Sequence, residues 1–304
     1  MTKERRGGAA LVAIGVYLVA ALLLVGTGTA RAGWERISQL LSLQGQPEPA
    51  SANVLSEHEI ERLDSMPAQA QAELLLERSI NHYKGTNEQI EARVGRWRGQ
   101  ITLNPRLDNL FRTAINSDDL RVRAAGLDVD LAARNIEKTT ATVDRLEPVA
   151  RAGEQGPRAN ALWDLGLMGN RGVQPERIAQ ILSSSLRDDN ENIRYWAVEG
   201  MAYLGTDETI EPLLEVFHDD PSARIRERAA CSLAQSGMLN KQQRYRAVPR
   251  LLDFAEDGSL DAETRSWVYQ ALRDITGENL PRDSAAWRQW YATRNARSAE
   301  RPLP

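Results

Sequence analysis

The sequence contains few residues that form disulfides or bind metals. Among its 304 residues there are one cysteine, Cys231, and three histidines. One thiol cannot form an internal disulfide, so we expect Cys231 to be a small buried side chain within a helix. His58 is followed by Glu59, but Arg62 stands where an H-E-x-x-H zinc motif needs its second histidine. The sequence therefore predicts no metal site and no bound cofactor.

A strong net charge and the common catalytic motifs are also lacking. The formal net charge is −4, with 26% charged residues, which leaves no basic excess of the kind that displaces counterions from nucleic acid. The sequence has no glycine-rich phosphate loop, no G-x-S-x-G turn and no C-x-x-C pair. We therefore expect no nucleic-acid partner, no catalytic residues and no enzymatic activity.

The chain does contain a cassette that recurs along its second half. In each copy an arginine is followed three positions later by a small or apolar residue. The arginines are Arg123, Arg158, Arg194, Arg226 and Arg265. They follow one another at intervals of 35, 36, 32 and 39 residues, a period typical of stacked helical hairpins. No segment alternates with the period of two expected of strands, so we predict an all-α solenoid.

Apolar residues spaced three and four positions apart divide this region into five hairpins, each with a first (A) and a second (B) helix. The predicted pairs are 106–116 with 120–134, 143–152 with 157–169, 175–186 with 193–204, 208–217 with 223–236, and 247–256 with 262–276. A stack of hairpins needs covered ends. We therefore expect a helical N-terminal cap at 56–103, the repeats at 104–277, and a C-terminal cap helix and frayed tail at 278–304.

The N-terminal segment is the one long apolar run. Lys3, Arg5 and Arg6 precede an uncharged stretch whose centre, residues 9–25, is almost wholly apolar. Residues 1–33 therefore read as a signal anchor spanning the membrane through residues 9–30, or as a signal peptide cleaved after Ala32. An anchor places the repeats outside the cytoplasmic membrane of a bacterium as a single-pass protein, and cleavage makes the protein secreted or periplasmic. Residues 34–55, with two prolines, are expected to be a linker.

The cassette and its surroundings resemble HEAT repeats, most closely the short bacterial kind also found in phycobilin lyases. The resemblance lies in an apolar A helix, an Asp-rich turn, and Val/Ile-Arg-x-x-Ala followed by leucine and glycine on the B helix. It is clearest over 174–277 and weaker over 104–172, where the first hairpin lacks the final glycine and the second lacks the aspartate pair. The resemblance implies a right-handed α-solenoid of about five hairpins that binds proteins.

Two groups of side chains are candidates for a function. Most of the cassette arginines directly follow an acidic turn, so we interpret them as structural rather than as a basic ladder for a ligand. We expect each guanidinium to bond a carboxylate of that turn and to reach carbonyls of the neighbouring hairpin, and in HEAT repeats such pairs tie one hairpin to the next. For a partner surface we single out Tyr195, Glu199, Arg228 and Trp267 on the B helices. Trp196 is either packed between hairpins or part of the same surface.

These observations lead to the hypothesis of a non-enzymatic, membrane-associated HEAT-repeat scaffold that binds a protein or peptide partner through its solenoid surface. Two alternatives stay open: a HEAT-like enzyme or chromophore-handling, lyase-like protein, and a structural subunit of a membrane assembly. Fold alone does not decide between them.

Overall fold

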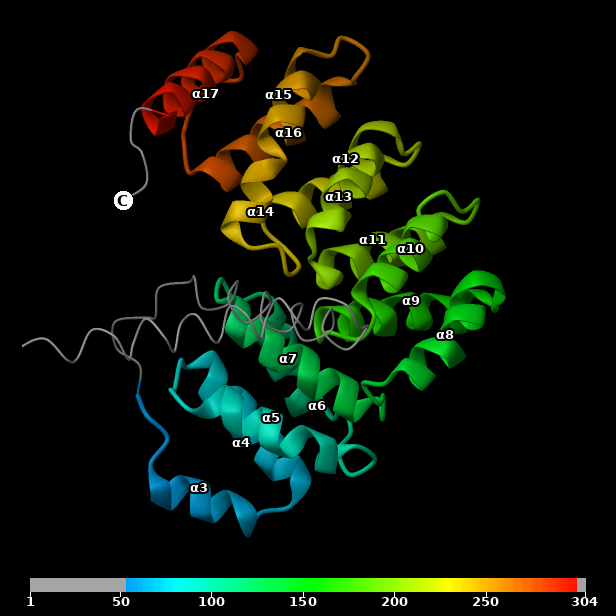
Figure 1. The fold of residues 1–304 in the computed structure, drawn as a ribbon, viewed down its shortest axis with the longest axis vertical. Helices are drawn as coiled ribbons and strands as arrows, with labels where there is room; N and C mark the ends of the chain where they lie inside the picture. The colour runs from blue at the N-terminus through cyan, green and yellow to red at the C-terminus, as the bar shows by residue number, and fades with distance from the viewer. Residues whose placement is uncertain (1–52, 300–304) are drawn as a thin grey trace, which may run out of the picture. The chain divides into compact units, whose positions relative to one another are not determined.

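The computed structural model describes residues 53–299, and within them every regular element is a helix (Figure 1). The one β-type pairing among these residues is an isolated bridge between Val54 and Lys84. The prediction of an all-α protein is confirmed for the described part of the chain.

A block of three helices precedes the hairpins: α3 (Glu57–Asp64), α4 (Ala68–Ile80) and α5 (Thr86–Trp97). Ser56 caps α3 because its side chain accepts a hydrogen bond from the Glu59 amide while the Glu59 carboxylate accepts one from the Ser56 amide. Leu55, at the end of the predicted linker, is buried and its amide donates to the Lys84 carbonyl at 3.1 Å. Residues 53–55 therefore belong to the helical block rather than to a linker.

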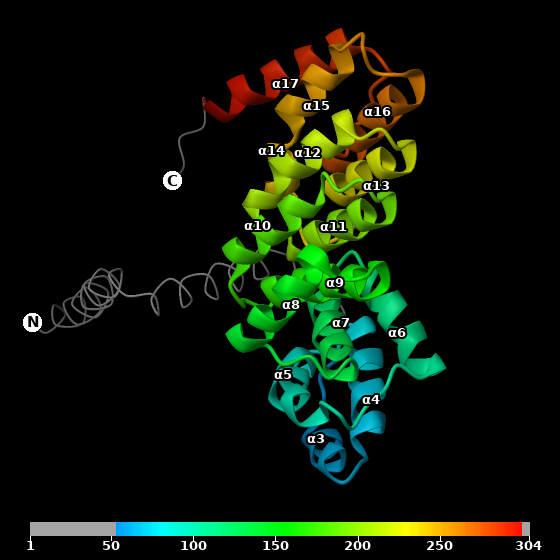
Figure 2. The same cartoon turned by 90° about the vertical axis from the view of Figure 1, so that its right-hand side faces the viewer.

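Five hairpins follow, as predicted. They are α6 (Pro105–Ile115) with α7 (Leu120–Ala133), α8 (Thr140–Ala152) with α9 (Gln155–Asn170), α10 (Pro175–Ser185) with α11 (Glu191–Leu204), α12 (Ile210–Asp219) with α13 (Ala223–Ala234), and α15 (Val248–Glu256) with α16 (Ala262–Thr276). A short 3-10 helix, η1 (Asp207–Thr209), leads into α12. In Figure 2 the A helices α8, α10, α12 and α15 form one layer and the B helices α9, α11, α13 and α16 form the other.

Two elements differ from the prediction. The short helix α14 (Lys241–Arg246) between the fourth and fifth hairpins was not expected, because six residues are too few to show a helical periodicity. The last helix, α17 (Ser284–Ala299), continues to the last described residue, into the stretch where we expected a frayed tail.

The second and third hairpins pack through glycine. A Cβ atom added at Gly166 of α9 would lie 2.4 Å from the Gly200 carbonyl oxygen of α11, so the two backbones approach each other directly. Gly169, which we expected to end its hairpin, lies inside α9 and allows the Leu204 side chain to approach. Gly205 does end α11, with a left-handed φ of 63°.

The first hairpin shares one apolar core with the three preceding helices, so α3 to α7 together are called the N-terminal block from here on. One continuous apolar cluster contains Trp97 of α5, Leu107 of α6 and Val129 of α7, and it extends from Leu55 to Ala132. The predicted boundary at residue 104 therefore does not separate two cores. Helix α7 is buried almost all around because it packs on α4, α5 and α6 as well as on α9.

No helix within residues 53–299 is long and apolar enough to cross a bilayer. The predicted anchor or signal peptide at 1–33, and the predicted linker up to residue 52, lie outside the described residues.

Candidate partner-binding surface

The cassette arginine of the third hairpin ties that hairpin to the fourth. Arg194 Nε lies 2.7 Å from Asp220 Oδ2, and Nη2 lies 3.1 Å from Oδ1, so the guanidinium and the carboxylate make two parallel hydrogen bonds. Arg194 Nη1 also donates to the carbonyl of Asp188 in its own turn at 2.9 Å. Both partners of the ion pair are buried. These bonds with Asp220 raise the pKa of Arg194 and keep it charged.

The same tie occurs on either side of this pair. Arg158 Nη2 lies 2.5 Å from Asp188 Oδ2, which joins the second hairpin to the third. Arg226 Nη2 lies 2.8 Å from Asp261 Oδ2, which joins the fourth to the fifth. These three cassette arginines do tie neighbouring hairpins, and their charges are already neutralised within the stack. The partners are the reverse of those we expected, because the carboxylate comes from the turn of the next hairpin, whereas Arg194 and Arg226 take carbonyls from their own turns. We call Arg158, Arg194 and Arg226, together with their aspartates, the ladder.

The two remaining cassette arginines have no aspartate of a following hairpin. Arg265 donates to the carbonyls of Asp257 and Leu260 at 3.1 and 2.9 Å. Arg123 donates to the Gln235 carbonyl at 3.0 Å and also to the Gly237 carbonyl, both more than a hundred residues away in the sequence. The second hairpin lacks the aspartate pair in its turn, so Arg123 has no equivalent of Asp220 to bond.

Three of the four predicted surface residues lie together on α11 and α13. Arg228 donates through Nε and Nη2 to the two carboxylate oxygens of Glu199. The Arg224 guanidinium lies 4.4 Å from the centre of the Tyr195 ring, in cation–π geometry. Burial, and then the neighbouring Glu199, raise the pKa of the Tyr195 hydroxyl.

Glu199 differs from the prediction because it is only 6% exposed. Its carboxylate is satisfied by Arg228, so it supports the surface from beneath and does not itself face solvent. Tyr195, Arg228 and Trp267 are partly exposed. Trp267 lies on α16 and makes no hydrogen bond, ring stacking or cation–π contact with the other three.

An aromatic cluster connects the first hairpin to the B helices. Trp163 of α9 is buried, packs edge to face against Phe111 of α6 and Trp196 of α11, and donates through Nε1 to Asp130 of α7 at 3.2 Å. Trp196 is half-buried at the edge of this cluster. Trp163 is thus a packing residue, whereas Trp196 both packs and faces solvent.

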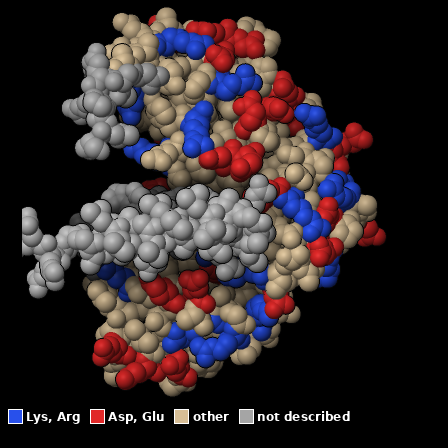
Figure 3. Space-filling model, in the orientation of Figure 1, with Lys and Arg blue, Asp and Glu red and all other residues tan. Residues whose placement is uncertain are grey.

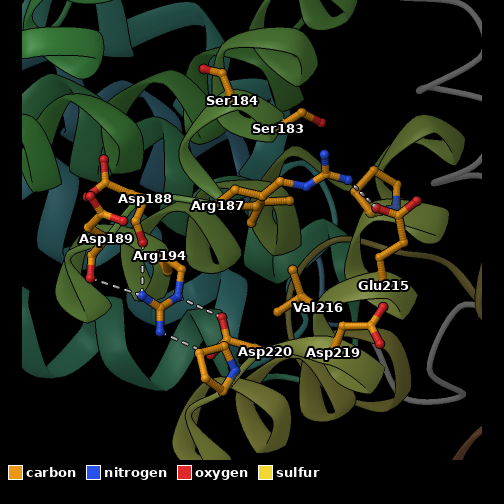
Figure 4. A pocket seen from close by; sticks show the side chains of 13 residues that line it. Ser183, Ser184, Arg187, Asp188, Asp189, Arg194, Glu215, Val216, Asp219 and Asp220 are labelled. Atoms are coloured by element: carbon orange, nitrogen blue, oxygen red, sulfur yellow. Dashed lines mark hydrogen bonds and ion pairs between the residues drawn. The ribbon is translucent and has the colours of Figure 1, made fainter.

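A groove of about 740 Å³ opens between the third and fourth hairpins, at their A–B turns (Figure 4). Arg194 and Asp220 form its floor, and Arg187 reaches across to Glu215 at 3.3 Å near its rim. Asp189 and Asp219 are exposed on its wall. The lining of the groove contains four aspartates, one glutamate and two arginines, so the groove carries a net negative charge. The sequence shows the aspartate pairs of the two turns but not that they share one concavity.

Charges of both signs are mixed over the face shown in Figure 3, without an unbroken stripe of either sign. Within residues 53–299, no group of three or more histidine, cysteine, aspartate or glutamate side chains is arranged to hold a metal ion.

Comparison with known proteins gives one family. The family model of HEAT repeats matches residues 143–234, from the second hairpin to the end of the fourth. The second hairpin lies inside this match, although its resemblance to HEAT repeats is weaker in the turn, which lacks the aspartate pair. The fifth hairpin lies outside the match. None of the curated proteins compared with the chain matches it. Over these three hairpins the chain is thus similar to HEAT repeats, a kind of repeat that suggests a scaffold for protein interactions.

Proposed function

We propose that this protein is a non-enzymatic scaffold that binds a protein partner through the surface of its repeats. The observation that carries the proposal is the ladder: three arginine–aspartate ties, of which that between Arg194 and Asp220 is buried, hold four consecutive hairpins in a fixed register. A surface held in register before binding loses little conformational freedom on association, which favours affinity.

The groove between the third and fourth hairpins is the proposed contact region. Its exposed acidic side chains, Asp189 and Asp219, lie beside Val216 and Pro212. Such a lining suits an extended partner segment that carries lysine or arginine, because opposite charge speeds encounter and fixes register. The surface residues Tyr195, Arg228 and Trp267 are a second region for the same kind of partner, with Glu199 holding Arg228 in place.

The test is capture of a partner by the full chain from detergent-solubilised membranes, with variants that separate the two regions. The variant Asp189→Lys with Glu215→Lys reverses charge in the groove, whereas Tyr195→Ala with Trp267→Ala alters the B-helix surface. Glu61→Lys with Glu91→Lys, at exposed positions of the N-terminal block, is the matched charge control. We expect the groove variant to lose a stoichiometric partner that the control retains.

Two results contradict this proposal. Retention of the partner by both test variants would place its binding elsewhere. Co-purification of a chromophore that the chain transfers to another protein would favour the lyase-like alternative.

The proposed location is the outer side of a bacterial cytoplasmic membrane, and it rests on the apolar run at residues 9–30. N-terminal sequencing of the mature protein tests it. A start at Gly33 indicates a cleaved signal and a secreted or periplasmic protein, whereas an uncleaved chain in the membrane fraction indicates an anchor.

A further inference from the structure

A second groove, of about 600 Å³, lies between the turn of the first hairpin and the end of the fourth. Its lining includes Asp118 and Arg123 from the first hairpin, Gln235 after α13, and Lys241 and Arg244 of α14. It therefore joins two parts of the chain that are more than a hundred residues apart in the sequence.

Two buried arginines meet in this groove without a carboxylate between them. Arg123 Nη2 and Arg244 Nη2 each lie 3.0 Å from the same acceptor, the Gln235 carbonyl oxygen. The other bonds of Arg244 go to the carbonyls of Leu239 and Ser236 at 2.8 and 2.9 Å. Arg244 is 8% exposed, and its Nη1 is buried with no hydrogen-bond partner.

The charge balance of this pair differs from that of the ladder. Carbonyl oxygens at the end of α13 offset part of the positive charge, as at any helix C-terminus. They supply no full negative charge, and burying an unpaired cation is costly. Burial, and then the neighbouring Arg123, lower the pKa of Arg244 to about 10.

The acidic side chains near the groove do not fill this role. Asp274 is exposed and accepts from Gln235 Nε2 at 2.6 Å. Asp118 is exposed and lies beyond ion-pair distance of both arginines, so its charge only partly offsets the effect of burial on the pKa of Arg123. Lys241 is exposed at the same groove and adds a further positive charge.

We propose that this groove binds a carboxylate group, whose charge the uncompensated guanidinium of Arg244 balances from the floor of the groove and Lys241 attracts from the rim. Two sources present the same chemistry: a small free dicarboxylate, or an acidic side chain of a peptide. A carboxylate held here bridges the first hairpin to α14, so its binding stabilises the contact between the N-terminal block and the repeats.

The experiment is calorimetric titration of the full chain with succinate and, separately, with a short polyglutamate peptide, at low ionic strength and with sodium chloride as the control. We expect saturable binding of at least one of the two. Arg244→Met should weaken binding at least about tenfold, which corresponds to roughly 1.4 kcal/mol. Arg246→Met on the same helix, whose arginine is exposed and paired with Asp207, should leave it unchanged.

Lys241→Met is the second variant, because removal of an exposed lysine does not threaten folding. We expect it to weaken binding a few-fold and to reduce its dependence on salt. Binding of succinate alone identifies a free dicarboxylate as the ligand, and binding of the peptide alone identifies an acidic segment. If neither probe binds more tightly than chloride, or if Arg244→Met and Lys241→Met both bind like the unaltered chain, the two arginines serve only to cap α13 and the proposal is wrong.

Discussion

Arg123 and Arg194 occupy the same position in their hairpins but lie in different surroundings. Arg194 makes two parallel bonds to Asp220 of the next hairpin. Arg123 finds only carbonyls, two of them at the far end of α13. The difference arises in the neighbouring turn, which offers an aspartate in one case and none in the other. An arginine at the same position of the cassette therefore forms a regular tie within the repeats and an irregular contact in the first hairpin.

The largest expected effect comes from breaking the buried tie of the ladder. Asp220→Ala leaves the Arg194 guanidinium buried without its carboxylate, which should cost about 3–5 kcal/mol of unfolding free energy. Asp261, whose side chain is 53% exposed, pairs with Arg226 and caps α16. Asp261→Ala should therefore cost only about 1 kcal/mol. Urea denaturation measures both.

Asp118→Ala is the matched change in the N-terminal block. Asp118 is exposed and does not bond Arg123, so its loss should alter stability by no more than about 0.5 kcal/mol. Equal losses for Asp118→Ala and Asp220→Ala would show that the cassette arginines depend on acidic turns to the same extent in both regions, contrary to the comparison.

The next effect contrasts glycines of the two regions. Gly166→Ala places a Cβ atom against the backbone of Gly200 and forces α9 and α11 apart, which should cost about 3 kcal/mol. Gly95→Ala, on the exposed side of α5, meets no atom within 4 Å and should stabilise the helix by about 0.5–1 kcal/mol. Thermal unfolding of the two variants gives shifts of opposite sign if the close approach is real. A neutral Gly166→Ala variant would contradict it.

Sequence periodicity predicts the helices of the repeats well because each amphipathic helix carries its own signal. Helix α16 was expected at 262–276 and is found at Ala262–Thr276. Helix α14 has no such period. Its one local signal is the pairing of Asn240 with Gln243 in a capping box.

The candidate surfaces are less predictable because they depend on neighbours that are distant in the sequence. Tyr195 and Glu199 are four positions apart on one helix, yet only the packing of α13 decides that Glu199 is covered by Arg228. The contact of Arg123 with Gln235 spans 112 residues. No local pattern encodes it, since it follows from how the first hairpin packs on the rest.

An effect smaller than that of Gly166→Ala concerns the carboxylates where α7 meets α9. Asp164 of α9 is 6% exposed, its Oδ1 lacks a hydrogen-bond partner, and Arg134 Nη1 lies 3.5 Å from it. Burial, opposed by the nearby Arg134 and reinforced by Asp130, raises the pKa of Asp164 to about 6. Asp130 shares Arg134 and also has a raised pKa, chiefly through burial.

The folded state therefore holds a proton on Asp164 more firmly than the unfolded chain does. Stability should rise as the pH falls from above 6 toward the ordinary carboxyl pKa, and the ionised group should destabilise the junction at higher pH. The difference between the pKa of Asp164 in the folded protein and its ordinary value limits this destabilisation to about 3 kcal/mol. Asp164→Asn removes the buried charge, but it also removes a partner of Arg134, so the gain should be smaller than this limit. We expect the variant to be more stable than the unaltered chain by about 1–2 kcal/mol near pH 8.

The gain should disappear near pH 5, where the unaltered Asp164 is largely protonated in the folded protein. Urea denaturation at the two pH values measures this change. The control is Asp144→Asn, at an exposed carboxylate that is paired with Arg177 within the repeats. It should change the free energy of unfolding by a small amount that is the same at both pH values. If Asp164→Asn is no more stable than the unaltered chain at the higher pH, the junction already compensates its buried charge. The N-terminal block and the repeats would then differ in the pattern of their ties but not in the electrostatic cost of joining them.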